Sequence, residues 1–242
     1  MAGPTGDHRH DVASIRARLA DGANPSYLRD WVYGAIDGAV TTFAIVAGVV
    51  GAELSAGVVL ALGAANLFAD GFSMAAANFS GTRSEHQERR RLAAIEHRHI
   101  RDNPEGERRE IREIFRRKGF EDPVLEEIVD VVTRDQTLWV ETMLADEYGQ
   151  PPVLREPRKA AGVTFAAFCL AGAAPLLPFV FGFDDAALWA LALTGATFFG
   201  VGALKSRWET THWSRSGAET LGIGLTAAGV AFSVGWLLRD LI

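Results

Sequence analysis

Two long apolar stretches lie next to each other between Trp31 and Ser80, and a short polar turn around Glu53 separates them. Each stretch holds about 20 residues, which is enough for a helix to cross the hydrocarbon core of a bilayer. The same pattern returns in the last third of the chain. We therefore predict an all-α membrane protein with five transmembrane helices. The predicted spans cover about residues 28–52 and 56–80, which together form the segment 28–80, and then 160–182, 186–204 and 218–238.

A charged segment, residues 81–157, interrupts the apolar pattern between the second and third spans. Its apolar residues recur at helical spacing, so we predict that this insert is helical and that its first helix continues span 2. Spans 3 to 5 lie in residues 158–242. The segment 1–27 precedes span 1, and its residues 1–7 are predicted to be disordered. Asp11 is placed to cap a short helix at the membrane interface, with a soluble helix or a frayed tail as alternatives.

The basic residues fall almost entirely at one end of the predicted spans. Of the 24 Lys and Arg residues, 23 precede span 1, lie between spans 2 and 3, or lie between spans 4 and 5, and the remaining one is Arg239. Short loops rich in Lys and Arg stay on the cytoplasmic side of a membrane. We therefore predict that the N-terminus and the insert are cytoplasmic and that the C-terminus lies outside.

Composition excludes several classes of protein. The formal net charge of −6 argues against nucleic acid as a partner. The single cysteine, Cys169, excludes a disulfide within the chain and a zinc site built from several cysteines. Arginine outnumbers lysine by 21 to 3, which suggests a prokaryotic source and hence a location in the plasma membrane.

Two carboxylates lie well inside the apolar runs of the first two spans, Asp37 in span 1 and Asp70 in span 2. A carboxylate at such depth costs about 2.5–3.5 kcal/mol on insertion scales, so a function is the default hypothesis for both. Other residues share a helix face with them because they lie at steps of four. These are Thr41 in span 1 and Asn66, Met74 and Asn78 in span 2. We predict that this polar face, with a thioether in it, lines a path for a cation.

Glycines in span 1 provide for a close helix contact beside this polar face. Gly34 and Gly38 are four residues apart, and small residues at this spacing let two helices approach closely within a membrane. We predict that spans 1 and 2 meet across these glycines.

The insert carries possible metal ligands at helical spacing. Carboxylate and imidazole groups suit Fe(II), Mn(II) or Zn(II), and a thioether adds softness that Mg(II) and Ca(II) do not favour. The candidates form three groups on successive helices: Glu96 with His99, then Glu107 with Glu110 and Glu113, and finally Met143 with Glu147. The alternative is that these charges form the solvated face of Arg- and Glu-rich helices.

Four segments of the chain resemble the vacuolar iron transporter family. They are Asp-Gly-Ala-Val-Thr-Thr-Phe at 37–43, Asn-Leu-Phe-Ala-Asp-Gly-Phe-Ser-Met at 66–74, Asn-Pro-Glu-Gly-Glu at 103–107 and Leu-Trp-Val-Glu-Thr-Met-Leu-Ala-Asp-Glu-Tyr-Gly at 138–149. The resemblance implies five spans, a cytoplasmic metal-binding insert between spans 2 and 3, and a homodimer. It also implies export of Fe(II), and often Mn(II), from the cytosol in exchange for protons, across the vacuolar membrane in a eukaryote.

The resemblance further assigns roles to single residues. It places the intramembrane aspartate and methionine of the family at Asp37 and Met74. It places the ligands of the insert at Glu96, His99, Glu107, Glu110, Met143 and Glu147. His99 departs from the pattern because the family commonly has glutamate at this position, and imidazole favours zinc or another later metal such as cobalt.

Two other functions are compatible with parts of this pattern. A membrane-anchored iron store or sensor would use the insert alone, but an anchor has no need of Asp37 or Asp70. A di-iron oxidase would need a second Glu-x-x-His motif beside Glu96 and His99, and the chain has none. We therefore predict a transporter rather than an enzyme, with the lipid bilayer as its surroundings, divalent metal ions and protons as its substrates, and no prosthetic group.

Overall fold

The computed structural model describes residues 10–21 and 24–239. The predicted disorder of residues 1–7 lies outside these residues. Helix α1 (Val12–Asp21) begins as predicted after Asp11, whose carboxylate accepts a hydrogen bond from the backbone N–H of Ser14 at 3.0 Å. The described residues contain helices and no strand.

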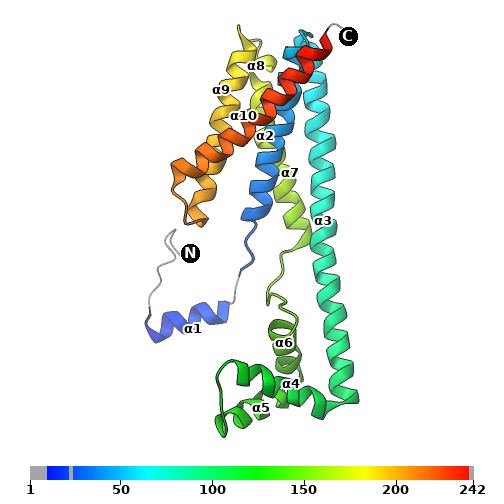
Figure 1. The fold of residues 1–242 in the computed structure, drawn as a ribbon, viewed down its shortest axis with the longest axis vertical. Coiled ribbons are helices and arrows are strands. Elements are labelled where there is room, and N and C mark those ends of the chain that lie inside the picture. The colour runs from blue at the N-terminus through cyan, green and yellow to red at the C-terminus, as the bar shows by residue number, and fades with distance from the viewer. Residues whose placement is uncertain (1–9, 22–23, 240–242) are drawn as a thin grey trace. The chain divides into compact units, whose positions relative to one another are not determined.

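Five helical segments are long and apolar enough to cross a membrane, which confirms the predicted number of spans. Helix α3 runs without a break from span 2 into the charged segment, as predicted (Figure 1). The segments are α2 (Leu28–Gly51), α3 (Ala56–Asp102), α7 (Pro157–Ala173) with its short continuation η1 and α8 to Val180, α9 (Ala186–Lys205) and α10 (Trp213–Leu238).

The last span begins five residues earlier than predicted, at Trp213 instead of 218. A polar run that includes Arg215 is part of this helix, although the apolar pattern alone excludes it. His212 explains the difference, because its Nδ1 accepts a hydrogen bond from the Ser214 backbone N–H at 3.4 Å and so caps the helix before the polar run.

The chain folds into two compact units. The first unit consists of residues 1–80 and 155–242, and the second consists of residues 81–154. Helix α3 therefore contributes its apolar half to the first unit and its charged half to the second.

Helix α2 is the centre of the first unit and packs against α7, α9 and α10. Gly34 and Gly38 allow a close contact with α7. A Cβ atom added at Gly34 would collide with the carbonyl oxygen of Thr164, and one added at Gly38 would collide with that of Phe168. Both partners lie on α7, so the prediction that these glycines bring spans 1 and 2 together is wrong. The glycines serve the α2–α7 contact instead.

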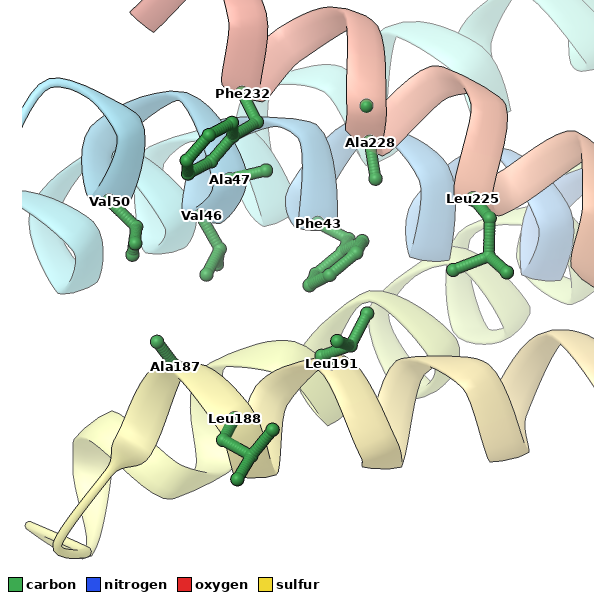
Figure 2. Close-up of a pocket in the computed structure, with 11 residues that line it drawn as sticks. Phe43, Val46, Ala47, Val50, Ala187, Leu188, Leu191, Leu225, Ala228 and Phe232 are labelled. Atoms are coloured by element: carbon green, nitrogen blue, oxygen red, sulfur yellow. The ribbon is translucent and has the colours of Figure 1, made fainter. Parts of the chain in front are cut away.

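An apolar cavity of about 470 Å³ lies between α2, α9 and α10 (Figure 2). Phe43 and Val46 of α2, Leu191 of α9 and Phe232 of α10 line it. Val46 follows Asp37 by nine residues, or about two and a half helical turns, so the cavity and the predicted polar path lie on opposite sides of α2. None of the predicted path residues lines this cavity.

The second unit is a small helical domain with its own apolar core. It combines the charged half of α3 with three short helices, and the core includes Ile111, Val129 and Met143. Asn103 and Asp135 start two of the helices by accepting hydrogen bonds from backbone N–H groups. The short helices are α4 (Pro104–Arg117), α5 (Val124–Arg134) and α6 (Gln136–Asp146).

Candidate metal centre

Three of the predicted ligands in the second unit come together. One ligand atom each from Glu96, His99 and Glu107 lie within 4.8 Å of one another. The Nδ1 atom of His99 is 3.7 Å from Oε1 of Glu96 and 3.5 Å from Oε1 of Glu107. Two carboxylates and an imidazole around one point form a donor set for Fe(II), Mn(II) or Zn(II).

The local structure explains how these three residues meet. Glu96 and His99 are one turn apart near the end of α3, so their side chains share a face. Asn103 ends that helix and caps the next one through a hydrogen bond from the Gly106 backbone N–H at 3.1 Å. This tight reversal places Glu107 in the first turn of α4, where the helix dipole favours a negative charge.

The carboxylates of this cluster are buried and incompletely paired. Glu96 is 1% exposed and Glu107 is 5% exposed. In both residues the Oε2 atom is buried and has no hydrogen-bond partner among the described residues. An unpaired buried carboxylate oxygen is costly, and a divalent cation would satisfy it. The His99 side chain is 44% exposed, so an ion can reach the cluster from solvent.

Burial and mutual repulsion hold protons at this site. Burial, and then the neighbouring charges of Glu110 and Glu96, raise the pKa of Glu107 to about 7. Burial likewise raises the pKa of Glu147, with contributions from Glu96 and Glu110. Near neutral pH Glu107 of the metal-free cluster is therefore partly protonated, and a cation would displace that proton.

Tyr148 is a member of the site that sequence reasoning missed. Its hydroxyl donates a hydrogen bond of 2.8 Å to Oε1 of Glu96. Burial raises the pKa of this phenol, so it stays protonated and remains a donor. The bond fixes the orientation of the Glu96 carboxylate. The only signal in the sequence was the position of Tyr148 directly after Glu147.

The other predicted ligands lie in two different surroundings. Glu110, Glu113 and Glu147 line one cavity of about 440 Å³ in the second unit. Within it, Glu113 forms ion pairs with Arg116 and Arg117 at 3.1 and 3.2 Å, as in a solvated helix face. Met143 is fully buried in the apolar core.

The predicted path residues of the first unit also meet in part. The Thr41 hydroxyl donates to the backbone oxygen of Asp37 at 2.9 Å, and Asn66 Nδ2 donates to Thr41 Oγ1 at 3.1 Å. The carboxyl groups of Asp37 and Asp70 are close enough to interact electrostatically. These contacts place the polar faces of α2 and α3 opposite each other. Met74, one turn after Asp70, is half-buried.

A further carboxylate, Asp30, was missed because it lies just before the apolar stretch. The structure buries it almost completely, with an exposure of 1%. Its Oδ1 atom accepts hydrogen bonds from Arg155 and from Asn78 Nδ2, the latter at 2.9 Å. Because Asp30 lies at the predicted boundary of a span, its position in the sequence did not indicate that it is buried.

Comparison with known proteins places these features in a family. The model of the VIT family matches residues 28–236. The chain is 32% identical to a vacuolar iron transporter of Toxoplasma gondii, in a match that covers 97% of this chain and 79% of the relative. It is 29% identical to vacuolar iron transporter 1 of Arabidopsis thaliana, over 85% and 83% of the two chains. A vacuolar iron transporter of Plasmodium falciparum is 26% identical, over 88% and 82%.

The three relatives come from a plant and two parasites, all of them eukaryotes. They give no support to the prediction of a prokaryotic source. They match the chain over most of its length, including both the apolar segments and the charged segment between them.

Proposed function

The chain belongs to the VIT family, whose members are transporters and not enzymes, and from this premise we propose that it exports Fe(II) from the cytosol in exchange for protons. The observation that carries the proposal is the cluster of Glu96, His99 and Glu107, with two buried carboxylate oxygens that have no hydrogen-bond partner in the described part of the chain. Such a cluster captures a divalent ion and concentrates it. The ion is the substrate of the protein and not a resident cofactor.

The donor set supports a substrate range wider than iron. Carboxylate oxygens suit Fe(II) and Mn(II), whereas the imidazole of His99 adds affinity for Zn(II) and Co(II). We place this second unit, residues 81–154, on the cytoplasmic side because Lys and Arg are concentrated there. Capture on that side fits export from the cytosol.

Passage through the membrane uses the polar faces of α2 and α3. A metal ion needs the deprotonated form of Asp37 or Asp70, so protons and metal compete for the same oxygens. This competition is sufficient to couple the two movements in opposite directions. Met74 adds a thioether ligand next to Asp70 and favours transition metals over Ca(II) and Mg(II).

A homodimer completes the path in this proposal. Tyr33 on α2, and Phe68 and Phe72 on α3, are exposed near the polar residues. A second copy that packs there around a two-fold axis would cover both polar faces and present the same carboxylates from the other side.

The test is metal transport by the reconstituted protein. Liposomes that contain the protein and a trapped Fe(II)-sensitive dye receive Fe(II) and a proton gradient, beside liposomes with the variants Asp37→Ala and Glu53→Ala. We expect gradient-dependent entry in the wild type and the Glu53 control, and entry at the level of empty liposomes in the Asp37 variant.

Two outcomes would contradict the proposal. Proton-driven entry that persists in the Asp37→Ala variant would remove Asp37 from the path. No entry through folded wild-type protein that still binds Fe(II) would favour the alternative function of a membrane-anchored iron store or sensor.

A further inference from the structure

Within the first unit, the apolar half of α3 makes less extensive backbone contacts than the other long helices do. Among the described residues, the most extensive backbone contacts join α2 with α7, α9 and α10, and α9 with α10, whereas α3 makes no comparably extensive contact. Leu62, Phe68 and Phe72 on the outer surface of α3 are exposed. In a membrane these side chains contact lipid as favourably as protein, so this outer surface contributes little to how far α3 is shifted along α2. The inner surface of α3 packs against α7, where the Leu67 side chain lies against Gly172.

Two asparagines of α3 supply specific contacts with α2. Asn66 Nδ2 donates hydrogen bonds to Oγ1 of Thr41 at 3.1 Å and of Thr42 at 3.2 Å. Asn78 Nδ2 donates to Oδ1 of Asp30 at 2.9 Å. The two asparagines are twelve residues apart, about 18 Å along the helix axis. They hold α3 to α2 at two separate points.

The contact at Asn78 is embedded in a buried polar cluster. Besides Asp30, Asn78 Nδ2 reaches the hydroxyl oxygen of Thr164 on α7 at 2.7 Å. Arg155 neutralises the Asp30 carboxylate, whose Oδ2 atom is buried without a hydrogen-bond partner in the described part of the chain. A shift of α3 by one turn, about 5.4 Å, would take Asn78 away from Asp30 and leave a buried carboxylate with one partner fewer. The cluster therefore opposes such a shift.

We infer that Asn66 and Asn78 are positioning residues that fix the register of α3 against α2. Asp70 and Met74 lie between the two asparagines at steps of four residues, so this register determines where both stand relative to Asp37. Asn66 was predicted as part of the path, and it therefore also sets the position of the other path residues on α3. The importance of these residues for transport rests on the proposed function, whereas their role in fixing the register is independent of it.

The experiment measures the register directly. Spin labels are attached to Tyr33→Cys on α2 and Ala69→Cys on α3, both exposed positions, in a Cys169→Ser background. Excess unlabelled protein ensures that the measured distance belongs to one chain. We expect a narrow distance distribution for the parent protein, and a shift or broadening of about one helical turn, near 5 Å, in Asn66→Leu and Asn78→Leu. The control Ala77→Leu, at the exposed neighbour of Asn78, should leave the distribution unchanged.

An exchange of the two partners separates positioning from a general loss of stability. Asn78→Asp places a second carboxylate against Asp30 and should displace α3 by repulsion. Adding Asp30→Asn restores one carboxylate facing one amide and should return the parent distance. In vesicles, Asn78→Leu should lower the maximal metal flux per folded protein on the order of tenfold, while the metal concentration at half-maximal flux stays the same.

The outcomes distinguish this inference from the proposed function. Unchanged distances in both leucine variants would overturn the positioning role, even if the protein transports metal. Distances that shift in the leucine variants and return in the double variant would establish the role, even if the wild-type protein moves no metal.

Discussion

In the proposed function, Glu107 serves metal capture at the expense of stability. Its carboxylate is buried beside Glu96 and close to Glu110, and these surroundings favour its protonated form. The proton lowers the cost of burial when no metal is present. Metal binding replaces that proton, because only the ionised carboxylate is a good ligand.

This arrangement predicts the direction of the pH dependence. The pKa of Glu107 rises from 4.5 to about 7 on folding, so the contribution of this group to the stability of the metal-free protein is largest below pH 4.5. Up to roughly 3 kcal/mol of that contribution is lost as the pH rises through 7. Hydrogen exchange in α4, corrected for intrinsic rates and measured with a chelator, should therefore show weaker protection at pH 8 than at pH 5. Metal affinity should change in the opposite direction and increase with pH.

Glu107→Gln is the matched variant for this prediction, because it keeps the shape of the side chain without a charge. It should flatten the pH dependence of protection and raise the stability of metal-free protein at pH 8, while weakening metal binding. The same pH dependence in wild type and variant would assign the titration to another group.

For single residues, local spacing in the sequence predicted some members of the candidate site and missed others. Glu96 and His99 were found because one helical turn brings them together whatever the rest of the fold does. Tyr148 and Asp30 were missed because their partners, Glu96 and Asn78, lie 52 and 48 residues away in the sequence. No periodic pattern links residues at such separations.

The elements themselves followed from the apolar pattern, but their partners did not. Five long helices and the continuation of α3 were predicted from hydrophobic length and helical spacing. Gly34 and Gly38 were recognised as a close-contact face of α2, yet they were assigned to α3 instead of α7. Small residues indicate that some helix approaches closely, and the choice among several apolar helices depends on the shapes of all of them.

The α2–α7 contact gives a prediction at the level of elements. In Gly38→Ala the new methyl group would meet the backbone of Phe168, which cannot move aside as a flexible side chain can. We expect the unfolding free energy to fall by about 1–3 kcal/mol, measured as a lower thermal transition of the protein in detergent. Gly162→Ala on α7 is the control, because a Cβ there meets nothing within 4 Å. Helix propensity favours alanine over glycine in both variants, so Gly162→Ala should not lose stability. A loss of equal size in both variants would mean that the collision with the Phe168 backbone does not govern the effect.

For the whole molecule, the distribution of basic residues predicts an orientation in the membrane. In a Cys169→Ser background, single cysteines replace Ser55 between spans 1 and 2, Glu127 in the second unit and Asp184 between spans 3 and 4. All three positions are exposed. An impermeant thiol reagent added to intact cells that carry the protein in the plasma membrane should label 55 and 184, and should label 127 only after permeabilisation. Labelling of 127 in intact cells would reverse the orientation and the proposed direction of export.

The sequence by itself determined the number of spans, the all-helical class, the charged segment between spans 2 and 3, and the pair of Glu96 with His99. All of these depend on properties that repeat along the chain, namely apolar length, helical period and the sign of charge. The tertiary structure decided which carboxylates are buried, that Tyr148 orients Glu96, that Asn78 reaches Asp30 and that α7 packs on the glycines of α2. Each of these depends on which faces of distant helices meet, and side-chain shape and hydrogen bonding across those faces select one arrangement among several that the same apolar pattern allows.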